Sequence, residues 1–115
     1  MSEPNIVRVD DVAWEPHPRF SALQVKVLES KATHPFASVM LVQVEPGGII
    51  PEHFHTIEIE TAFVMAGTGV LTVDGKDYPF EAGINASVPV GAMHSVRNIG
   101  TVPLEIYAIH TPPVR

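Results

Sequence analysis

Short apolar runs separated by chain-bending residues dominate this 115-residue sequence, which contains 11 prolines and 8 glycines. No segment carries a persuasive helical period, whereas short runs rich in β-branched and aromatic residues recur along the chain. This pattern predicts an all-β protein. The expected strands are Ile6–Val9, Ser21–Leu28, Phe36–Val44, His53–His55, Glu60–Ala66, Val70–Val73, Asp77–Phe80, Ala86–Val88, His94–Asn98 and Leu104–His110.

The dipeptide Asp74-Gly75 predicts a tight turn between two of these strands. Both central positions of a type I′ turn need a positive φ, which glycine adopts freely and aspartate tolerates. We therefore expect residues 70–80 to form a β-hairpin. The length of the chain fits one domain with a buried core.

Composition and charge disfavour several classes of protein. Hydrophobic residues make up 45% and charged residues 17% of the chain, so it should fold rather than stay disordered. A net charge of −6 argues against a nucleic-acid-binding surface, and no apolar run is long enough to span a membrane. Because cysteine is absent, disulfides and thiolate ligands are excluded. The first residues do not resemble a signal peptide, so we expect a cytoplasmic location.

Three histidines and one glutamate are candidates for a metal site. Side chains two residues apart share one face of a strand, so His53 and His55 would lie together with Phe54 on the other face. Imidazole and carboxylate groups suit a divalent first-row transition metal. Glu60 and His94 could complete the set, although His94 can join only if the chain folds back, as in an antiparallel barrel. Considered one at a time, such residues also occur without a metal: a histidine pair or a glutamate on an exposed surface, and a single histidine in a loop or in the core.

The two segments that carry these residues resemble both sequence motifs of the cupin superfamily, in the right order and with no departure in spacing. The first runs from Gly47 to Gly67 and contains His53, Phe54, His55 and Glu60; the second runs from Gly83 to Asn98 and contains Pro89, Gly91 and His94. The resemblance covers about a third of the chain. It implies a single-domain antiparallel jelly-roll (cupin) β-barrel over residues 21–115.

The resemblance also implies that His53, His55, Glu60 and His94 bind one divalent metal per chain. Manganese, iron, nickel, zinc and copper all suit such a ligand set. Histidines must be neutral to bind a metal, so we expect the metal to be lost below about pH 6.

Residues 1–20 are less regular and are expected to form an N-terminal arm. In small cupins such an arm often contacts a partner subunit, so the resemblance implies a homodimer, which would also cover exposed sheet edges. Trp14 could anchor that contact or could pack on its own barrel. His17 and His34, which lie next to prolines, are expected to be exposed loop residues.

The last expected strand adds a candidate catalytic residue. Leu104, Ile106, Ala108 and His110 share one face. His110 could therefore reach the metal site as a base or a substrate contact, or it could lie exposed at the end of the strand. Glu60 and His110 are the two candidate catalytic residues.

Other residues are candidates for the walls and mouth of a pocket. Three apolar residues are expected on the same strand faces as the candidate ligands and predict an apolar wall: Ala62, Val64 and Val96. Glu52 and Glu58 could transfer protons if they turned inward, although exposure is the simpler interpretation. Candidates for the rim are Phe36, Met93 and Tyr107. Arg97 is expected to point away from the face of His94, although it could bind a carboxylate at the mouth.

The resemblance implies several functions for a metal in an apolar pocket, among them dioxygenase, decarboxylase, oxalate-consuming and isomerase activities. The leading hypothesis is a dioxygenase-like oxidoreductase that acts on a small carbonyl or aromatic compound. Oxalate and phosphosugars are less favoured as substrates, because the sequence shows no convincing cationic partner inside the pocket. A non-catalytic module that binds a small molecule is the alternative, and a metal-free barrel is a third.

Overall fold

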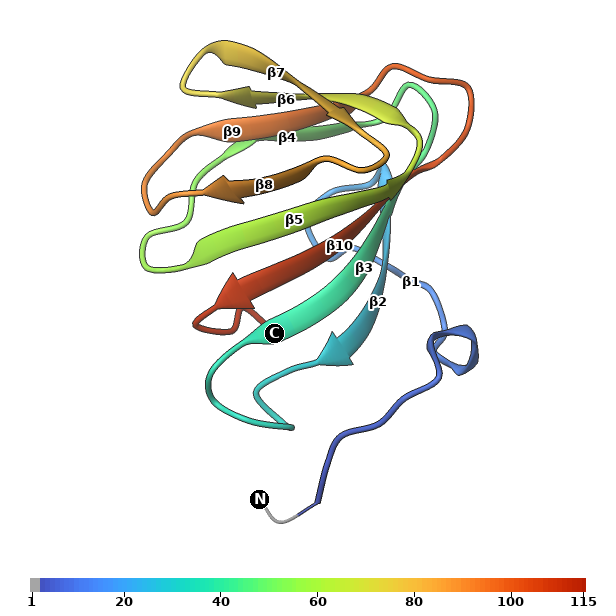
Figure 1. The fold of residues 1–115 in the computed structure, drawn as a ribbon, viewed down its shortest axis with the longest axis vertical. Helices are drawn as coiled ribbons and strands as arrows, with labels where there is room; N and C mark the ends of the chain where they lie inside the picture. The colour runs from blue at the N-terminus through green and yellow to red at the C-terminus, as the bar shows by residue number, and fades with distance from the viewer. Residues whose placement is uncertain (1–2) are drawn as a thin grey trace.

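The computed structural model describes residues 3–115, which form two antiparallel sheets that face each other (Figure 1). The strand order is β1-β2-β3-β10-β5-β8 in the six-stranded sheet and β4-β9-β6-β7 in the four-stranded sheet. The strands are β1 (Glu15–Pro16), β2 (Leu23–Glu29), β3 (Ser38–Val44), β4 (Ile49–His53), β5 (Ile59–Ala66), β6 (Thr68–Val73), β7 (Lys76–Glu81), β8 (Asn85–Val88), β9 (His94–Asn98) and β10 (Leu104–Thr111). The predicted all-β jelly-roll class is confirmed.

The core lies between the two sheets and follows the alternation expected of strands. Apolar residues of β3 and β10 lie opposite each other in register, and both members of each pair are buried. These pairs are Met40 with Ala108, Val42 with Ile106, and Val44 with Leu104. Leu71, Phe80 and Val96 of the four-stranded sheet belong to the same core. Burial of these side chains removes apolar surface from water and is the main force that holds the sheets together.

The hairpin predicted at Asp74-Gly75 is confirmed and supports a neighbouring loop. Asp74 has a φ of 47° and Gly75 a φ of 82°, and the turn joins β6 to β7. The amide N–H of Asp74 donates to the carbonyl of Met93 (2.8 Å), and the Met93 amide donates to Oδ1 of Asp74 (3.0 Å). The turn thereby fixes the residue that precedes His94.

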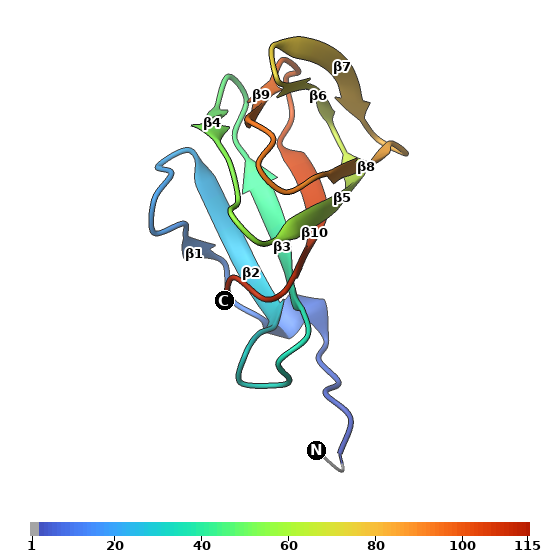
Figure 2. The ribbon, with the colours of Figure 1, turned by 90° about the vertical axis from the view of Figure 1, so that its left-hand side faces the viewer.

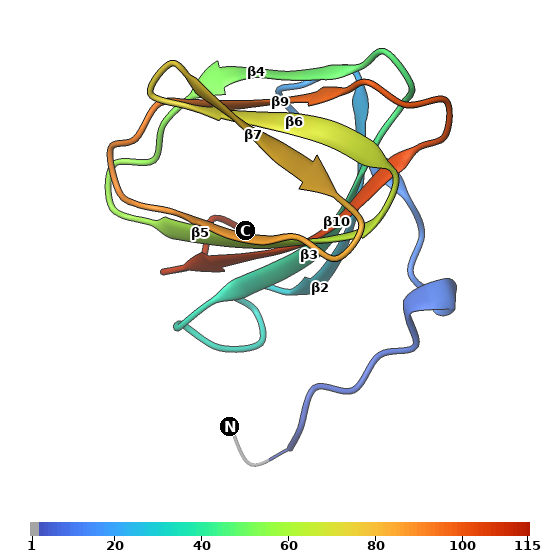
Figure 3. The same cartoon turned by 45° about the horizontal axis from the view of Figure 1, so that its top comes forward.

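The N-terminal segment differs from the sequence prediction. The expected strand Ile6–Val9 does not form, because Ile6 is 84% exposed and pairs with no strand among residues 3–115. Val9–Asp11 instead makes one turn of 3-10 helix. This segment runs outside the two sheets before β1 joins the edge of β2 (Figure 3). The Nζ of Lys26 lies 4.9 Å from the centre of the Trp14 ring, so Trp14 contacts its own barrel.

No helix in the described part of the chain has the length and apolar character that crossing a membrane would require.

Candidate metal centre

Two of the candidate ligands come from adjacent strands of the four-stranded sheet. His53 is the last residue of β4 and His94 the first residue of β9, and the antiparallel register places them opposite each other. Their ring centres are 4.1 Å apart. Residues 41 positions apart in the sequence therefore become neighbours through strand pairing alone.

His55 reaches the same cluster by a different route from the one predicted. The expected strand His53–His55 is wrong, because β4 ends at His53 and His55 lies in the loop that follows. The amide N–H of Gly91 donates to the carbonyl of His55 (2.9 Å) and fixes this loop against the segment before β9. The ring of His55 lies 5.2 Å from that of His53, while Phe54 is exposed.

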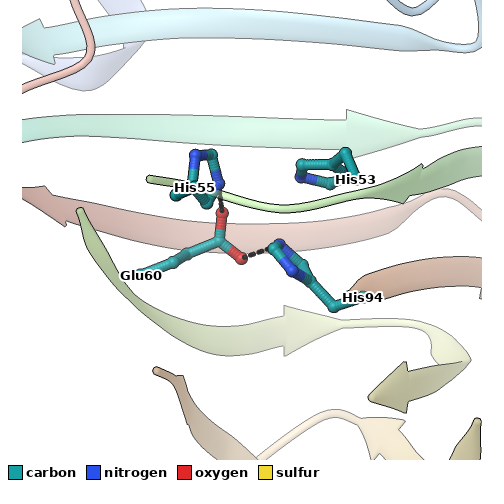
Figure 4. Close-up of side chains that lie close together, drawn as sticks. All are labelled: His53, His55, Glu60 and His94. Atoms are coloured by element: carbon teal, nitrogen blue, oxygen red, sulfur yellow. Dashed lines mark ion pairs between the residues drawn. The ribbon is translucent and has the colours of Figure 1, made fainter. Parts of the chain in front are cut away.

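Glu60 enters the cluster from the six-stranded sheet, opposite His110 in the register of β5 and β10. Nε2 of His110 lies 2.7 Å from Oε1 of Glu60, and because a carboxylate only accepts, His110 is the donor. The same Oε1 lies 3.5 Å from Nε2 of His55, and Oε2 lies 3.7 Å from Nε2 of His94 (Figure 4). His110 is only 3% exposed, so the interpretation of an exposed strand end is wrong.

The four candidate ligands form a cluster that could hold a metal ion. One ligand atom from each of His53, His55, Glu60 and His94 lies within 4.8 Å of the other three. Nδ1 of His53 lies 2.8 Å from the carbonyl oxygen of Pro51, and Nδ1 of His94 lies 2.9 Å from that of Ala92. Since a carbonyl only accepts, Nδ1 must carry the proton, and the lone pair of each neutral ring is on Nε2.

Two buried nitrogens of this cluster have no hydrogen bond within residues 3–115. They are Nε2 of His55 and Nε2 of His94. Buried polar atoms normally have a hydrogen-bond partner, so two buried nitrogens without one, next to a carboxylate, require an explanation. A divalent transition metal would use both nitrogens and the carboxylate, and the residues present therefore fit such an ion.

The electrostatics of the cluster keep its carboxylate charged. Burial by itself would raise the pKa of Glu60, but contacts with His110 and His55 hold that pKa well below its usual range. The Glu60 carboxylate in turn raises the pKa of His55. Burial lowers the pKa of His53 and favours its neutral form. Glu60 is thus anionic at any ordinary pH, and His53 favours the neutral form that a metal would require.

A cavity of about 310 Å³ opens beside the cluster, and all four candidate ligands line it. This volume is near the lower end of the range for ligand pockets. Its wall is largely apolar, as predicted, and includes Ala62 and Val96, whereas Val64 is buried in the core away from it. The predicted rim residues, Phe36, Met93 and Tyr107, do not line the cavity.

Cationic side chains do line the cavity, contrary to the sequence prediction. Arg19 and Arg115 are both part of its wall, together with His17. The expectation that His17 is exposed is wrong, because its ring stacks on Phe20 at 4.9 Å and is half-buried. No local pattern in the sequence could have revealed this group, since Arg115 is nearly 100 residues away from His17 and Arg19 and meets them only in the folded chain.

The remaining candidates lie at the margins of the site. Nδ1 of His55 lies 3.9 Å from a carboxylate oxygen of half-buried Glu58, while Glu52 is exposed on β4. Arg97 points away from the cavity, as expected, and its guanidinium lies 3.7 Å from Asp77. His34 lies in a loop, as expected, but it is half-buried beside Glu29 (3.6 Å) rather than exposed.

Comparison with known proteins identifies relatives of this architecture. A family model described as the cupin domain matches residues 40–110. The oxalate-binding protein of Thermotoga maritima is 32% identical over 84 residues, which cover 72% of this chain and 69% of that protein. The mannose-1-phosphate guanylyltransferase of Klebsiella pneumoniae is 35% identical over 77 residues, but this chain spans only 16% of its length.

A solved structure resembles the whole fold. The crystal structure of a predicted oxalate decarboxylase from Thermotoga maritima superimposes with a TM-score of 0.84 and 26% identity, and it covers 93% of this chain and 98% of its own. The likeness therefore extends over nearly the full length of both chains.

Proposed function

This chain belongs to the cupin family, and on that premise we propose that it is a metal-dependent cupin. His53, His55, Glu60 and His94 would hold one divalent transition metal beside the apolar cavity. The observation that carries the proposal is the convergence of four ligand atoms within 4.8 Å, with the lone pairs of His53 and His94 fixed on Nε2. Manganese, iron, nickel, zinc and copper all suit these donors.

The protein's own residues would prepare this site for a ligand. A divalent metal, when bound, supplies Lewis-acid or redox chemistry to a small molecule that binds beside it. His110 donates to Oε1 of Glu60 and orients the carboxylate. The apolar wall, which includes Ala62 and Val96, excludes water and strengthens electrostatic interactions inside the cavity.

For the reaction, we propose oxidation of a small carbonyl or aromatic compound in the manner of a dioxygenase. The apolar cavity beside a histidine-rich cluster supports this proposal. Protein loaded with iron or manganese should consume oxygen in the presence of such compounds, and Glu60→Gln should abolish the uptake. Ligand binding without oxygen uptake or any other turnover would instead support the non-catalytic binding module.

Oxalate is a second candidate ligand, favoured by the relatives and by the charge at the cavity. The similar Thermotoga maritima protein is an oxalate-binding protein, and two arginines line the cavity of this chain. Calorimetry with the zinc-loaded protein tests this candidate. Oxalate binding that disappears when the metal is removed would support it, and the absence of binding to loaded protein would exclude it.

The ligand assignment is tested by a matched pair of variants, Glu60→Gln and Glu52→Gln. Both remove one carboxylate from the same region, but only Glu60 lies in the cluster, while Glu52 is exposed. We expect about one metal per chain in the wild type and in Glu52→Gln, and at least a tenfold loss of zinc affinity in Glu60→Gln. Unchanged affinity in Glu60→Gln would contradict the proposal.

A further inference from the structure

The segment that follows β10 returns across one end of the barrel and brings Arg115 to the cavity. The amide N–H of Val114 donates to Oγ of buried Ser38 (3.0 Å), and the amide N–H of Lys31 donates to the carbonyl of Arg115 (2.8 Å). Figure 2 shows this end of the chain beside β1 and β2. Two anchors therefore hold Arg115 in place, and its side chain is only 23% exposed.

The guanidinium of Arg115 is only partly satisfied. Nη1 lies 3.6 Å from the carboxylate of Glu15, whose side chain is 55% exposed. Nη2 is buried and makes no hydrogen bond to any described residue. A guanidinium is always charged, and leaving one of its donors buried without a partner costs free energy. Since Arg115 lines the cavity, a ligand inside the cavity can supply the missing acceptor.

Two further donors lie on the same part of the cavity wall. The guanidinium of Arg19 lies 5.0 Å from the centre of the Phe20 ring. Nδ1 of His17 accepts hydrogen bonds from the amide N–H groups of Arg19 (3.0 Å) and Phe20 (3.3 Å). The proton of neutral His17 is therefore on Nε2, which leaves this ring with an N–H to donate. This part of the wall is rich in donors, and the neighbouring carboxylate of Glu15 is already paired with Nη1 of Arg115.

Phe20 lies between these donors and the metal centre. Its ring is 4.9 Å from that of His17 and 5.4 Å from that of His53. The donors and the metal ligands thus border one cavity at separate places, with an aromatic ring between them. Most of the other residues that line the cavity are apolar core side chains.

We propose that Arg115, with Arg19 and His17, forms a carboxylate-binding subsite at the cavity. The ligand would be an organic acid with an apolar segment, whose carboxylate lies on Arg115 and whose other end extends toward the metal; this last part rests on the proposed function. The planar edge of a guanidinium matches a carboxylate. A phosphate dianion is disfavoured, because Glu15 and Glu60 border the same region of a chain with a net charge of −6.

Binding of two probes that share a phenylpropyl skeleton and differ in the terminal group, a carboxylate in one and a neutral hydroxyl in the other, tests the subsite. The probes are 3-phenylpropionate and 3-phenylpropan-1-ol, and their dissociation constants are measured by calorimetry on zinc-loaded and on metal-free protein. We expect the wild type to prefer the acid by about tenfold, the gain typical of a hydrogen bond to a charged group. Arg115→Met should abolish most of this preference while leaving the affinity for the alcohol unchanged.

Two further variants complete the test. Arg97→Met is the matched control, because Arg97 is exposed and pairs with Asp77 away from the cavity, and it should keep the full preference. Arg19→Met removes an exposed guanidinium, and it should reduce the preference even if Arg115→Met proved unstable.

Each outcome has a distinct meaning. A preference for the acid that survives both Arg115→Met and Arg19→Met would overturn the subsite, and so would equal binding of the two probes by the wild type. Tighter binding of 2-phenylethyl phosphate than of 3-phenylpropionate would overturn the carboxylate assignment. A protein that binds no zinc but shows the arginine-dependent preference would support the subsite and contradict the metal-dependent function.

Discussion

The two histidines that face each other across β4 and β9 are oriented in the same way by the backbone. Each donates its Nδ1–H to the carbonyl of the residue two positions earlier, Pro51 for His53 and Ala92 for His94. This bond selects the tautomer and directs Nε2 away from that carbonyl, where a metal would need it. His55 has no such bond and depends on Glu60 and Glu58 for its electrostatic partners.

Among single residues, His110 can be tested most directly for an effect on metal affinity. Its Nε2–H donates to Oε1 of Glu60 at 2.7 Å, and Phe can fill most of its buried volume without donating. We expect His110→Phe to weaken zinc affinity by about tenfold, because a carboxylate ligand without its orienting donor binds metal less well. Competition with a chromogenic chelator measures the affinity.

A matched variant separates this effect from a general disturbance. His34→Phe removes a histidine that also lies beside a carboxylate, Glu29, but His34 is in the loop between β2 and β3 and is not a member of the cluster. It should leave zinc affinity unchanged. If His110→Phe bound zinc as tightly as His34→Phe does, the orienting role of His110 would be excluded.

Among the elements, the turn that joins β5 to β6 is tightly packed at Gly67. Gly67 has a φ of 96°, and a Cβ at this position would lie 2.8 Å from the Cα of Leu104 and from the carbonyl oxygen of Pro103. Gly83, before β8, has nearly the same φ of 93° but nothing within 4 Å of the Cβ position. The two glycines therefore share a backbone conformation and differ in packing.

Because of this contrast, we expect the substitution of glycine by alanine to lower the free energy of unfolding by different amounts at the two positions. Gly83→Ala should lower the free energy of unfolding by about 1 kcal/mol, the cost of a left-handed conformation for a residue with a Cβ. Gly67→Ala should cost about 1–3 kcal/mol more, because it also forces the backbone of β10 away. Urea denaturation followed by fluorescence of Trp14 measures both. Equal costs would show that the contact with Leu104 is easily relaxed.

In the whole molecule, the cluster of candidate ligands lies where the two sheets meet. His53 and His94 belong to the four-stranded sheet, whereas Glu60 and His110 belong to the six-stranded sheet. Without a metal, the contact between His55 and Glu60 depends on charge. The raised pKa of His55 means that this contact stabilises the fold below about pH 6.5 and fades as pH rises through the folded pKa. The lowered pKa of Glu60 means that its contribution is present above about pH 4.5 and is lost in strong acid.

A bound metal should have the opposite pH dependence, since it needs neutral imidazoles. We expect the increase in melting temperature that zinc causes to be larger at pH 8 than at pH 5.5, where protons compete for His55. Thermal denaturation with zinc and with a chelator, at both values, measures the difference. An equal increase at the two pH values would argue against binding by three histidines.

The homodimer and the partner contact of the N-terminal arm stay predictions. Trp14 contacts Lys26 of its own chain, which is one of the two arrangements that the sequence left open. That contact does not prevent the arm from also meeting a second subunit.

Local features of the sequence were enough to predict much of this protein. Alternating apolar residues predicted most of the strands, and Asp74-Gly75 predicted the hairpin. That His53, His55, Glu60 and His94 gather was implied by the resemblance to the two cupin motifs. These signals are local because strand alternation and turn conformation depend on neighbouring residues. The same reasoning was wrong for Ile6–Val9, where an apolar run has no strand beside it.

Other features depend on packing between distant segments, and only the tertiary structure could show them. His17 and Arg115 line one cavity, although they are 98 positions apart in the sequence. His110 is buried because β10 lies beside β5, which brings it to Glu60. A sequence specifies which residues can form strands and turns through neighbours along the chain. Which side chains then share a cavity is decided by sheet order and register, since these bring together residues that have no local relation.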